Sequence, residues 1–233
     1  MITHYPYENL GHANHGWLDA RHHFSFAGYQ DPQRMQFGVL RVINDDVIKA
    51  GAGFDTHPHR NMEIITYVKA GAITHRDSHG NVGRTVAGDV QVMSAGTGVY
   101  HSEFNLESEE TNIFQIWIEP NQLEVKPQWD SYKFPKEPTA DSLMLLVSGD
   151  GEAPLSIYQD AYIYAGNLCE GTELTHPIKH QVYVLVSEGV LELDGCLLNS
   201  GDGVEVSKLS SINLKALSNT KILVIDVPQN NTQ

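Results

Sequence analysis

Two stretches of the chain set the fold and point to a site: THPHRNMEIITYV at residues 56–68 and GDVQVMSAGTGVYHSE at residues 88–103. Each contains a pair of potential metal ligands separated by one residue, namely His57 and His59, and His101 and Glu103. Side chains two residues apart in an extended strand lie on the same face, so each pair can approach one ion. Imidazoles and carboxylates bind zinc, iron, copper or nickel, and four such ligands leave one or two coordination positions free. The two pairs therefore predict a metal site carried by two strands.

Short apolar runs and the glycines between them indicate the fold class. The expected strands are residues 37–43, 63–68, 72–76, 90–93 and 113–118. Gly, Asn or Asp residues separate these runs, and almost no stretch shows a 3.6-residue apolar period. Short strands broken by glycine turns build barrels and sandwiches, so the sequence predicts an all-β, or mostly β, protein. His-x-His alone is a weak signal in a chain with 12 histidines, and this framework favours a bound metal over incidental histidines.

The spacing of these residues resembles the two cupin motifs. The residues that match the first motif are Gly51, His57, His59, Glu63 and Gly71, with seven rather than the usual six residues before the last glycine. The residues that match the second motif are Gly88, Gly96, His101 and Asn105, and Ser94 stands where proline is common. Both quoted stretches, together with HGWLDARHHFSFAGYQDP at residues 15–32, resemble the pirin family in its short bacterial branch, which includes quercetinase-like members.

The resemblance implies two cupin β-barrel or jelly-roll domains in tandem, an arrangement called a bicupin. The expected domains are an N-terminal metal-binding cupin at residues 1–133 and a C-terminal degenerate cupin at residues 134–233 without metal ligands. A run with four prolines, from Pro120 to Pro138, fits an extended connector rather than a central strand.

The second half of the chain repeats the outline of the first. When Gly71 is aligned with Gly189, the positions of His57, His59 and Glu63 are taken by Thr175, Pro177 and Gln181. No histidine follows Gly201, so nothing replaces His101. His176 and His180 are four residues apart, which fits a helix better than a strand, and we expect them to be structural rather than metal ligands.

Two glutamates are candidates for the carboxylate ligand. Glu103 is two residues from His101, whereas Glu63 would lie about 13 Å from His59 along a straight strand and needs a chain reversal near residues 60 and 61. In the pirin family the glutamate of the second pair is the ligand, so the resemblance gives this role to Glu103. Glu63 is then a candidate to accept a hydrogen bond from a ligand imidazole, with a buried structural pair as the alternative.

The resemblance implies a metal-dependent dioxygenase that cleaves flavonols such as quercetin with O2 and releases CO. The expected cofactor is one divalent transition metal, with Fe(II) favoured and Zn, Ni, Cu or Mn as alternatives. Glu103, as ligand or as transiently released base, is the expected catalytic residue and takes the proton of the flavonol 3-hydroxyl group. The alternative is a regulator without turnover, in which the metal or its oxidation state controls binding to a protein partner, as in pirins that assist transcription factors. A metal-stabilised scaffold for an unrelated ligand is a third reading.

Composition excludes several classes of partner. The chain has 15 basic and 29 acidic residues, a formal net charge of −14, which argues against direct binding to nucleic acid or to an anionic membrane. Cys169 and Cys196 do not form a C-x-x-C motif, so neither a disulfide framework nor a thiolate site is expected. No segment approaches 18 apolar residues, and we expect a cytoplasmic protein.

Overall fold

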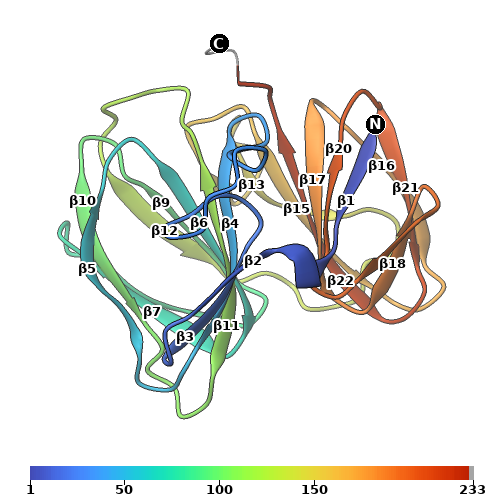
Figure 1. Ribbon diagram of the computed structural model, residues 1–233. Coiled ribbons are helices and arrows are strands. Elements are labelled where there is room, and N and C mark those ends of the chain that lie inside the picture. The colour runs from blue at the N-terminus through green and yellow to red at the C-terminus, as the bar shows by residue number, and fades with distance from the viewer. Residues whose placement is uncertain (231–233) are drawn as a thin grey trace. The chain divides into compact units, whose positions relative to one another are not determined.

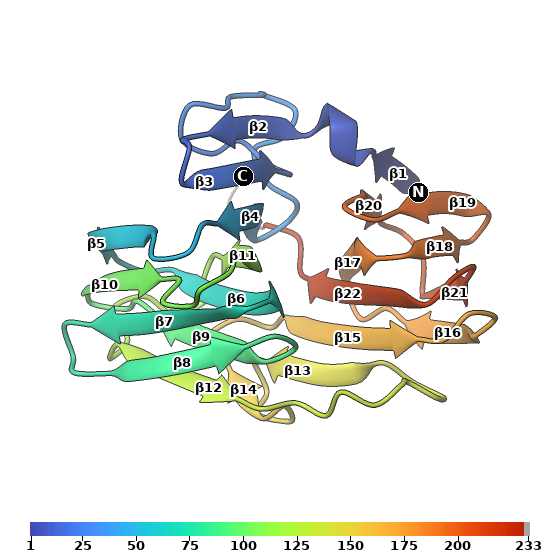
Figure 2. The same cartoon turned by 90° about the horizontal axis from the view of Figure 1, so that it is seen from below.

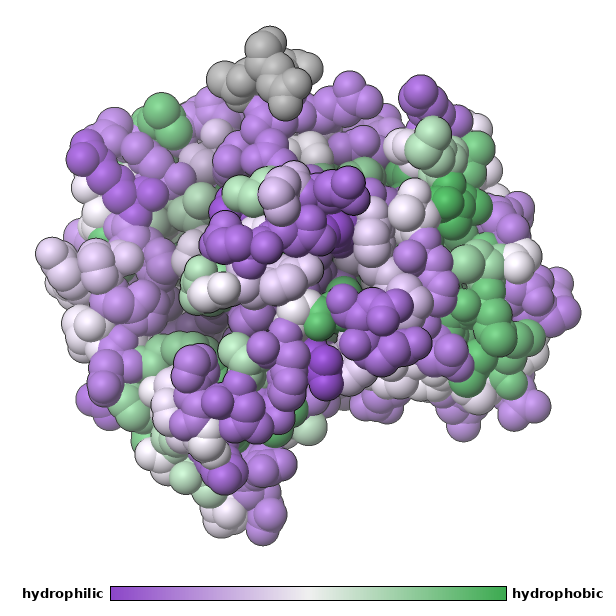
Figure 3. Space-filling view, viewed as in Figure 1, coloured by the Kyte–Doolittle hydropathy of each residue, from purple (hydrophilic) through white to green (hydrophobic). Residues whose placement is uncertain are grey.

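The computed structural model describes residues 1–230 and consists almost entirely of strands, as the sequence predicts (Figure 1). Within that range the helical structure is one short 3-10 turn, η1 (Tyr7–Asn9). No helix in the described part of the chain is long and apolar enough to cross a membrane. Hydrophilic residues cover most of the face drawn in Figure 3, in keeping with the negative net charge.

The strands form two compact units, which we call the first and the second unit. The first unit comprises Gly11–Phe134 and Pro154–Gln159. The second comprises Met1–Leu10, Pro135–Ala153 and the chain from Asp160 onward. The sequence predicted domains at 1–133 and 134–233. In the structure the first ten residues belong with the C-terminal part of the chain, because β1 (Ile2–Tyr5) pairs with β20 (Gly203–Val206) of the second unit.

The first unit is built from two antiparallel sheets (Figure 2). One has four strands in the order β5-β10-β7-β8, and the other has seven in the order β12-β9-β6-β11-β4-β3-β2. The strands of these two sheets are β2 (Gly11–Asn14), β3 (Leu18–His22), β4 (Leu40–Ile48), β5 (Gly53–His59), β6 (Glu63–Ala70), β7 (Ala72–Asp77), β8 (Val82–Val86), β9 (Val90–Ser94), β10 (Val99–Phe104), β11 (Thr111–Ile118) and β12 (Gln128–Tyr132). The residues of the unit also include the short β14 (Leu155–Ser156), which belongs to neither sheet.

Most expected strands occur with small shifts of their ends. The strand expected at 37–43 begins at Leu40 and runs on to Ile48, because residues 43–48 continue the pairing with β11. The expected proline-rich connector contains β12, which pairs only with β9 at the edge of its sheet. An edge strand tolerates flanking prolines since one side needs no ladder hydrogen bonds.

The second unit repeats this design around an apolar core. Its strands β1-β20-β17-β22-β15-β13 are consecutive neighbours in one sheet, and the others form a sheet in the order β16-β21-β18-β19. Beyond β1 and β20, they are β13 (Met144–Ser148), β15 (Tyr162–Leu168), β16 (Glu173–Pro177), β17 (Gln181–Glu188), β18 (Val190–Leu193), β19 (Cys196–Asn199), β21 (Ser211–Ala216) and β22 (Thr220–Val227). Valine, leucine and isoleucine side chains from both sheets meet in one buried cluster, which includes Val184, Leu191, Ile212 and Leu214.

Candidate metal centre

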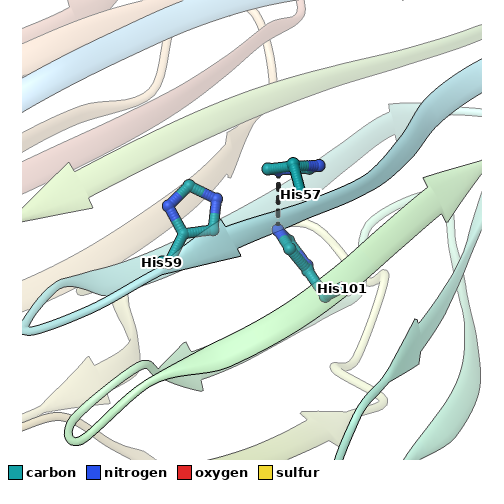
Figure 4. A group of neighbouring side chains, drawn as sticks. All are labelled: His57, His59 and His101. Atoms are coloured by element: carbon teal, nitrogen blue, oxygen red, sulfur yellow. Dashed lines mark hydrogen bonds between the residues drawn. The ribbon is translucent and has the colours of Figure 1, made fainter.

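Three histidines of the first unit converge where β5 and β10 pair. His57 and His59 project from β5 and His101 from β10 (Figure 4). His57 is the direct cross-strand partner of His101, and the Nε2 atoms of these two rings are 3.0 Å apart. One nitrogen from each of the three imidazoles lies within 4.8 Å of the other two. The pairing of two His-containing strands therefore brings together three of the four expected ligands.

Hydrogen bonds fix which ring nitrogens of these imidazoles carry protons. His57 Nδ1 lies 2.7 Å from the Asp55 carbonyl oxygen, to which it can only donate, so Nε2 of His57 keeps its lone pair. His75 Nε2 lies 3.1 Å from Asp77 Oδ2 and donates to it, which leaves His75 Nδ1 to accept from His101 Nδ1 at 3.4 Å. The Nε2 lone pair of His101 then faces that of His57.

This arrangement fits a transition-metal ion. Two lone pairs facing each other at 3.0 Å repel, and a shared cation between them would replace that repulsion by two bonds. Metal ligation also requires neutral imidazoles. Burial, together with the neighbouring His101 and His57, lowers the pKa of His59 to about 4. Burial, together with His57 and His75, lowers the pKa of His101 to about 3. Both rings are therefore neutral near pH 7.

Glu103 is buried on β10, the strand that carries His101, and faces the opposite sheet. Three side chains of that sheet donate hydrogen bonds to it. Gln91 Nε2 donates to Oε1 at 2.7 Å, and Thr66 Oγ1 donates to the same oxygen at 3.2 Å. Gln115 Nε2 donates to Oε2 at 2.7 Å. A carboxylate oxygen has about two acceptor positions, so Oε1 is filled and Oε2 retains one position for a cation or a proton. Glu103 forms a second cluster of possible ligand atoms with His75 and His101, within 4.8 Å of one another.

Glu63 lies apart from these clusters. The chain does reverse between β5 and β6, at Asn61 with a φ of 48°. Thr66 reaches Glu103, so the alternation of side chains along β6 places Glu63, three residues earlier, on the opposite face. There it accepts a hydrogen bond from Ser94 Oγ at 2.6 Å, and its Oε1 atom has no partner. Burial raises the pKa of Glu63 to about 7.

A cavity of about 560 Å³ in the first unit opens onto two of the three imidazoles, His57 and His59. The volume lies in the range of small-molecule sites. Its wall includes rings from the amino-terminal segment and from β11: His12, His15, His22, Phe26, Tyr29 and Trp117. Trp117 meets His59 edge to face, with 4.9 Å between the ring centroids. A planar aromatic molecule could therefore enter this cavity and contact the imidazole cluster.

Several residues of the site were not identified from the sequence. His75 and Asp77 have the same alternate spacing as the quoted pairs, which is the one local signal that could have revealed them. Gln91 and Gln115 carry no such signal, because their role follows from which strands face Glu103.

His176 of the second unit lies on strand β16, where its side chain is buried and faces inward. The neighbouring Thr175 is exposed and donates to Asn213 Oδ1 at 2.8 Å.

Comparison with known proteins gives matches along nearly the whole chain. The family model described as Pirin matches residues 4–118, and the model described as the quercetinase C-terminal cupin domain matches residues 145–227. The chain is 47% identical to a pirin-like protein of Caulobacter vibrioides, covering 97% of this chain and 99% of that protein. It is 41% identical to a protein of Escherichia coli named quercetin 2,3-dioxygenase, covering 94% and 95%. The crystal structure of a bacterial pirin from E. coli in complex with nickel(II) matches with a TM-score of 0.92 and 40% identity, covering 98% of this chain and 100% of that one.

Proposed function

Because this chain belongs to the pirin family, we propose that its first unit is a metal-dependent dioxygenase that cleaves flavonols such as quercetin with O2 and releases CO. The observation that carries the proposal is the cluster of His57, His59 and His101 at the wall of an aromatic-lined cavity. The curated relatives named quercetin 2,3-dioxygenase support the reaction type.

We assign the metal ligands as His57, His59, His101 and Glu103. When bound, a divalent transition ion would supply Lewis-acid and redox chemistry at this position. We propose Fe(II) as the working ion, with Ni, Zn, Cu or Mn as alternatives, since imidazole and carboxylate ligands accept all of them. The nickel complex of the E. coli pirin supports a transition metal in general.

The side chains around the cluster have distinct parts in the proposed reaction. The aromatic wall holds the flavonol rings and excludes water from them, with Trp117 beside His59. Acting as the transiently released base, Glu103 would take the proton of the flavonol 3-hydroxyl group at Oε2, the oxygen that has one acceptor position left. Gln91 and Thr66 keep the carboxylate oriented through Oε1, so Oε2 stays directed for this transfer.

The test is an assay of quercetin loss together with CO release, on protein purified without oxygen and loaded with Fe(II). We expect turnover in the unchanged chain and its loss in His57→Ala and in Glu103→Gln. His79→Gln is the matched control, because His79 is an exposed histidine whose ring contacts the Gly98 carbonyl oxygen instead of the cluster. Fully iron-loaded protein that consumes no oxygen with any flavonol would contradict the proposal.

A further inference from the structure

Two neighbouring aspartates on β4 have opposite environments. Asp45 accepts hydrogen bonds from Lys69 Nζ at 2.9 and 2.8 Å. Asp46 faces the other side of the strand, as alternation requires, and lines the cavity beside the imidazole cluster. The residue is 2% exposed, and its Oδ1 atom has no hydrogen-bond partner. An unpartnered buried polar atom destabilises the fold, so Asp46 calls for an explanation other than folding.

The two buried amide side chains of the same cavity wall already have partners. Asn44 Oδ1 lies 2.8 Å from His22 Nδ1. Gln115 donates to Glu103 and accepts a hydrogen bond from Trp117 Nε1 at 3.2 Å. These amides are therefore engaged in holding the wall itself, whereas Asp46 lines the same cavity and its Oδ1 atom has no hydrogen-bond partner.

The strand register gives the position of Asp46 relative to the imidazole cluster. On the paired strands β4 and β11, Asn44 lies opposite Gln115 and Asp46 lies opposite Ile113. Gln115 donates a hydrogen bond to Glu103, so these two residues lie at the same height along the strands. Asp46 is two residues farther along β4, which is about 7 Å in an extended strand. A ligand whose one oxygen lies at the cluster would thus present a more distant part of its ring system to Asp46.

The surroundings of Asp46 suit a hydroxyl group as its partner. Its cross-strand neighbours Ala20 and Ile113 are buried and apolar, so they offer no hydrogen bond. Burial, followed by the charges of Asp45 and Glu103, raises the pKa of Asp46 well above its usual range. A protonated carboxyl group both donates and accepts hydrogen bonds, and a phenolic hydroxyl group does the same.

We propose that Asp46 binds a hydroxyl group of the aromatic substrate and so selects flavonols that carry hydroxyl groups on ring positions remote from the 3-hydroxyl group. This inference rests on the proposed function for the class of substrate. It adds a second polar contact to the cavity, one that acts on binding and specificity and is separate from the metal ligands. An aromatic ligand without such hydroxyl groups would leave the Asp46 carboxyl group unpartnered.

The experiment compares the dissociation constants of quercetin and of 3-hydroxyflavone, which has the 3-hydroxyl group alone. The protein is loaded with Zn(II), which has no redox chemistry, and kept without oxygen so that binding is measured without turnover. We expect quercetin to bind the unchanged chain roughly tenfold or more tightly than 3-hydroxyflavone, the value of one hydrogen bond in a buried site. In Asp46→Leu we expect the two ligands to bind within about twofold of each other, because the partner of the remote hydroxyl group is gone.

Three further variants separate binding from folding. Asp46→Asn keeps a donor and an acceptor, so it should retain most of the preference, and Asp46→Ala serves as the truncation if the leucine variant does not fold. Asp45→Asn is the matched control, because it alters the neighbouring carboxyl group on the other face and should leave the preference unchanged. Metal content and thermal unfolding confirm that each variant is intact.

The outcomes distinguish the inference from the function it rests on. A preference for quercetin that persists in Asp46→Leu or Asp46→Ala overturns the inference and leaves the proposed function standing. Equal binding of both ligands by the unchanged chain also overturns the inference and leaves the proposed function standing. Failure of the zinc-loaded chain to bind either flavonol overturns both.

Discussion

The two units share one β design but differ in what their facing strands direct inward. In the first unit, β5 and β10 present imidazoles and a carboxylate, and the opposite sheet supplies amides and a hydroxyl group that hold the carboxylate. In the second, the corresponding strands β16 and β21 direct Leu174, Ile212 and Leu214 into an apolar cluster. The possible metal-ligand groups found among the described residues all lie in the first unit. The shared fold therefore supplies a scaffold, and a few inward positions decide whether possible metal ligands gather inside it.

Replacing a histidine of the cluster by leucine, the kind of residue found inside the second unit, should have the largest effect on metal affinity. In His101→Leu an apolar side chain takes the place of the imidazole that faces His57, as leucine does on β21. We expect metal affinity to fall by more than about 100-fold, beyond the usual cost of losing a hydrogen bond to a ligand. Metal content after dialysis measures this, with His176→Leu as the matched buried-histidine control. A His101→Leu protein that keeps one equivalent of metal would refute the ligand assignment.

The start of β6 offers a second comparison, because Gln181 begins β17 where Glu63 begins β6. The pKa of Glu63 is raised to about 7, against an ordinary 4.5, so the folded state binds more protons than the unfolded state between these values. Stability should therefore fall as pH rises through this window. From pH 5 to pH 8 we expect the unchanged chain to lose about 2–3 kcal/mol of unfolding free energy relative to Glu63→Gln. Denaturant unfolding at both pH values tests this, and parallel pH profiles of the two proteins would contradict it.

The hydrogen-bond chain behind His101 should affect metal binding to a smaller extent. His75 accepts from His101 and donates to Asp77, so His75→Phe removes the group that fixes the tautomer of His101. We expect metal affinity to fall by about 10–100-fold, measured by competition with a chelator. Unchanged affinity would show that the chain Asp77–His75–His101 has no part in ligation.

The smallest effect is expected at the histidine that the second unit retains. His176 is 5% exposed, its Nε2 atom has no partner, and burial lowers its pKa. A histidine held neutral in the folded state loses stability as pH falls below the ordinary pKa of 6.5. His176→Leu should raise the unfolding free energy by about 1 kcal/mol, more at pH 5 than at pH 8, without changing metal content. A decrease in stability at both pH values would mean that the imidazole has an unrecognised stabilising role.

The sequence was sufficient for the fold class and for the proximity of the imidazoles, because alternation and strand pairing are local rules. His57, His59 and His101 needed only two extended segments to lie side by side. Positions that depend on register or on a turn were harder to predict. The face taken by Glu63 depends on the reversal at Asn61, and the orientation of Asp46 depends on how β4 pairs with both neighbours.

Long-range pairing also lies outside local sequence rules. The predicted boundary at residues 133 and 134 follows chain order, but the first strand pairs with β20, about 200 residues later in the sequence. No local pattern in the amino-terminal residues predicts that β1 pairs with β20. Similarly, the alignment of the two halves placed Thr175 at the position of His57, whereas the inward-facing residues of β16 are Leu174 and His176. A shift of one residue exchanges the two faces of a strand.

X-ray absorption spectroscopy at the metal edge of the reconstituted protein tests the ligand assignment directly, since it identifies the atoms bound to the ion. We predict one ion surrounded by three imidazoles and additional oxygen ligands, with one imidazole fewer in His57→Ala and no change in His176→Leu. Fewer than three imidazoles in the unchanged protein, or sulfur ligands from Cys169 or Cys196, would show that the ion is not held by His57, His59 and His101.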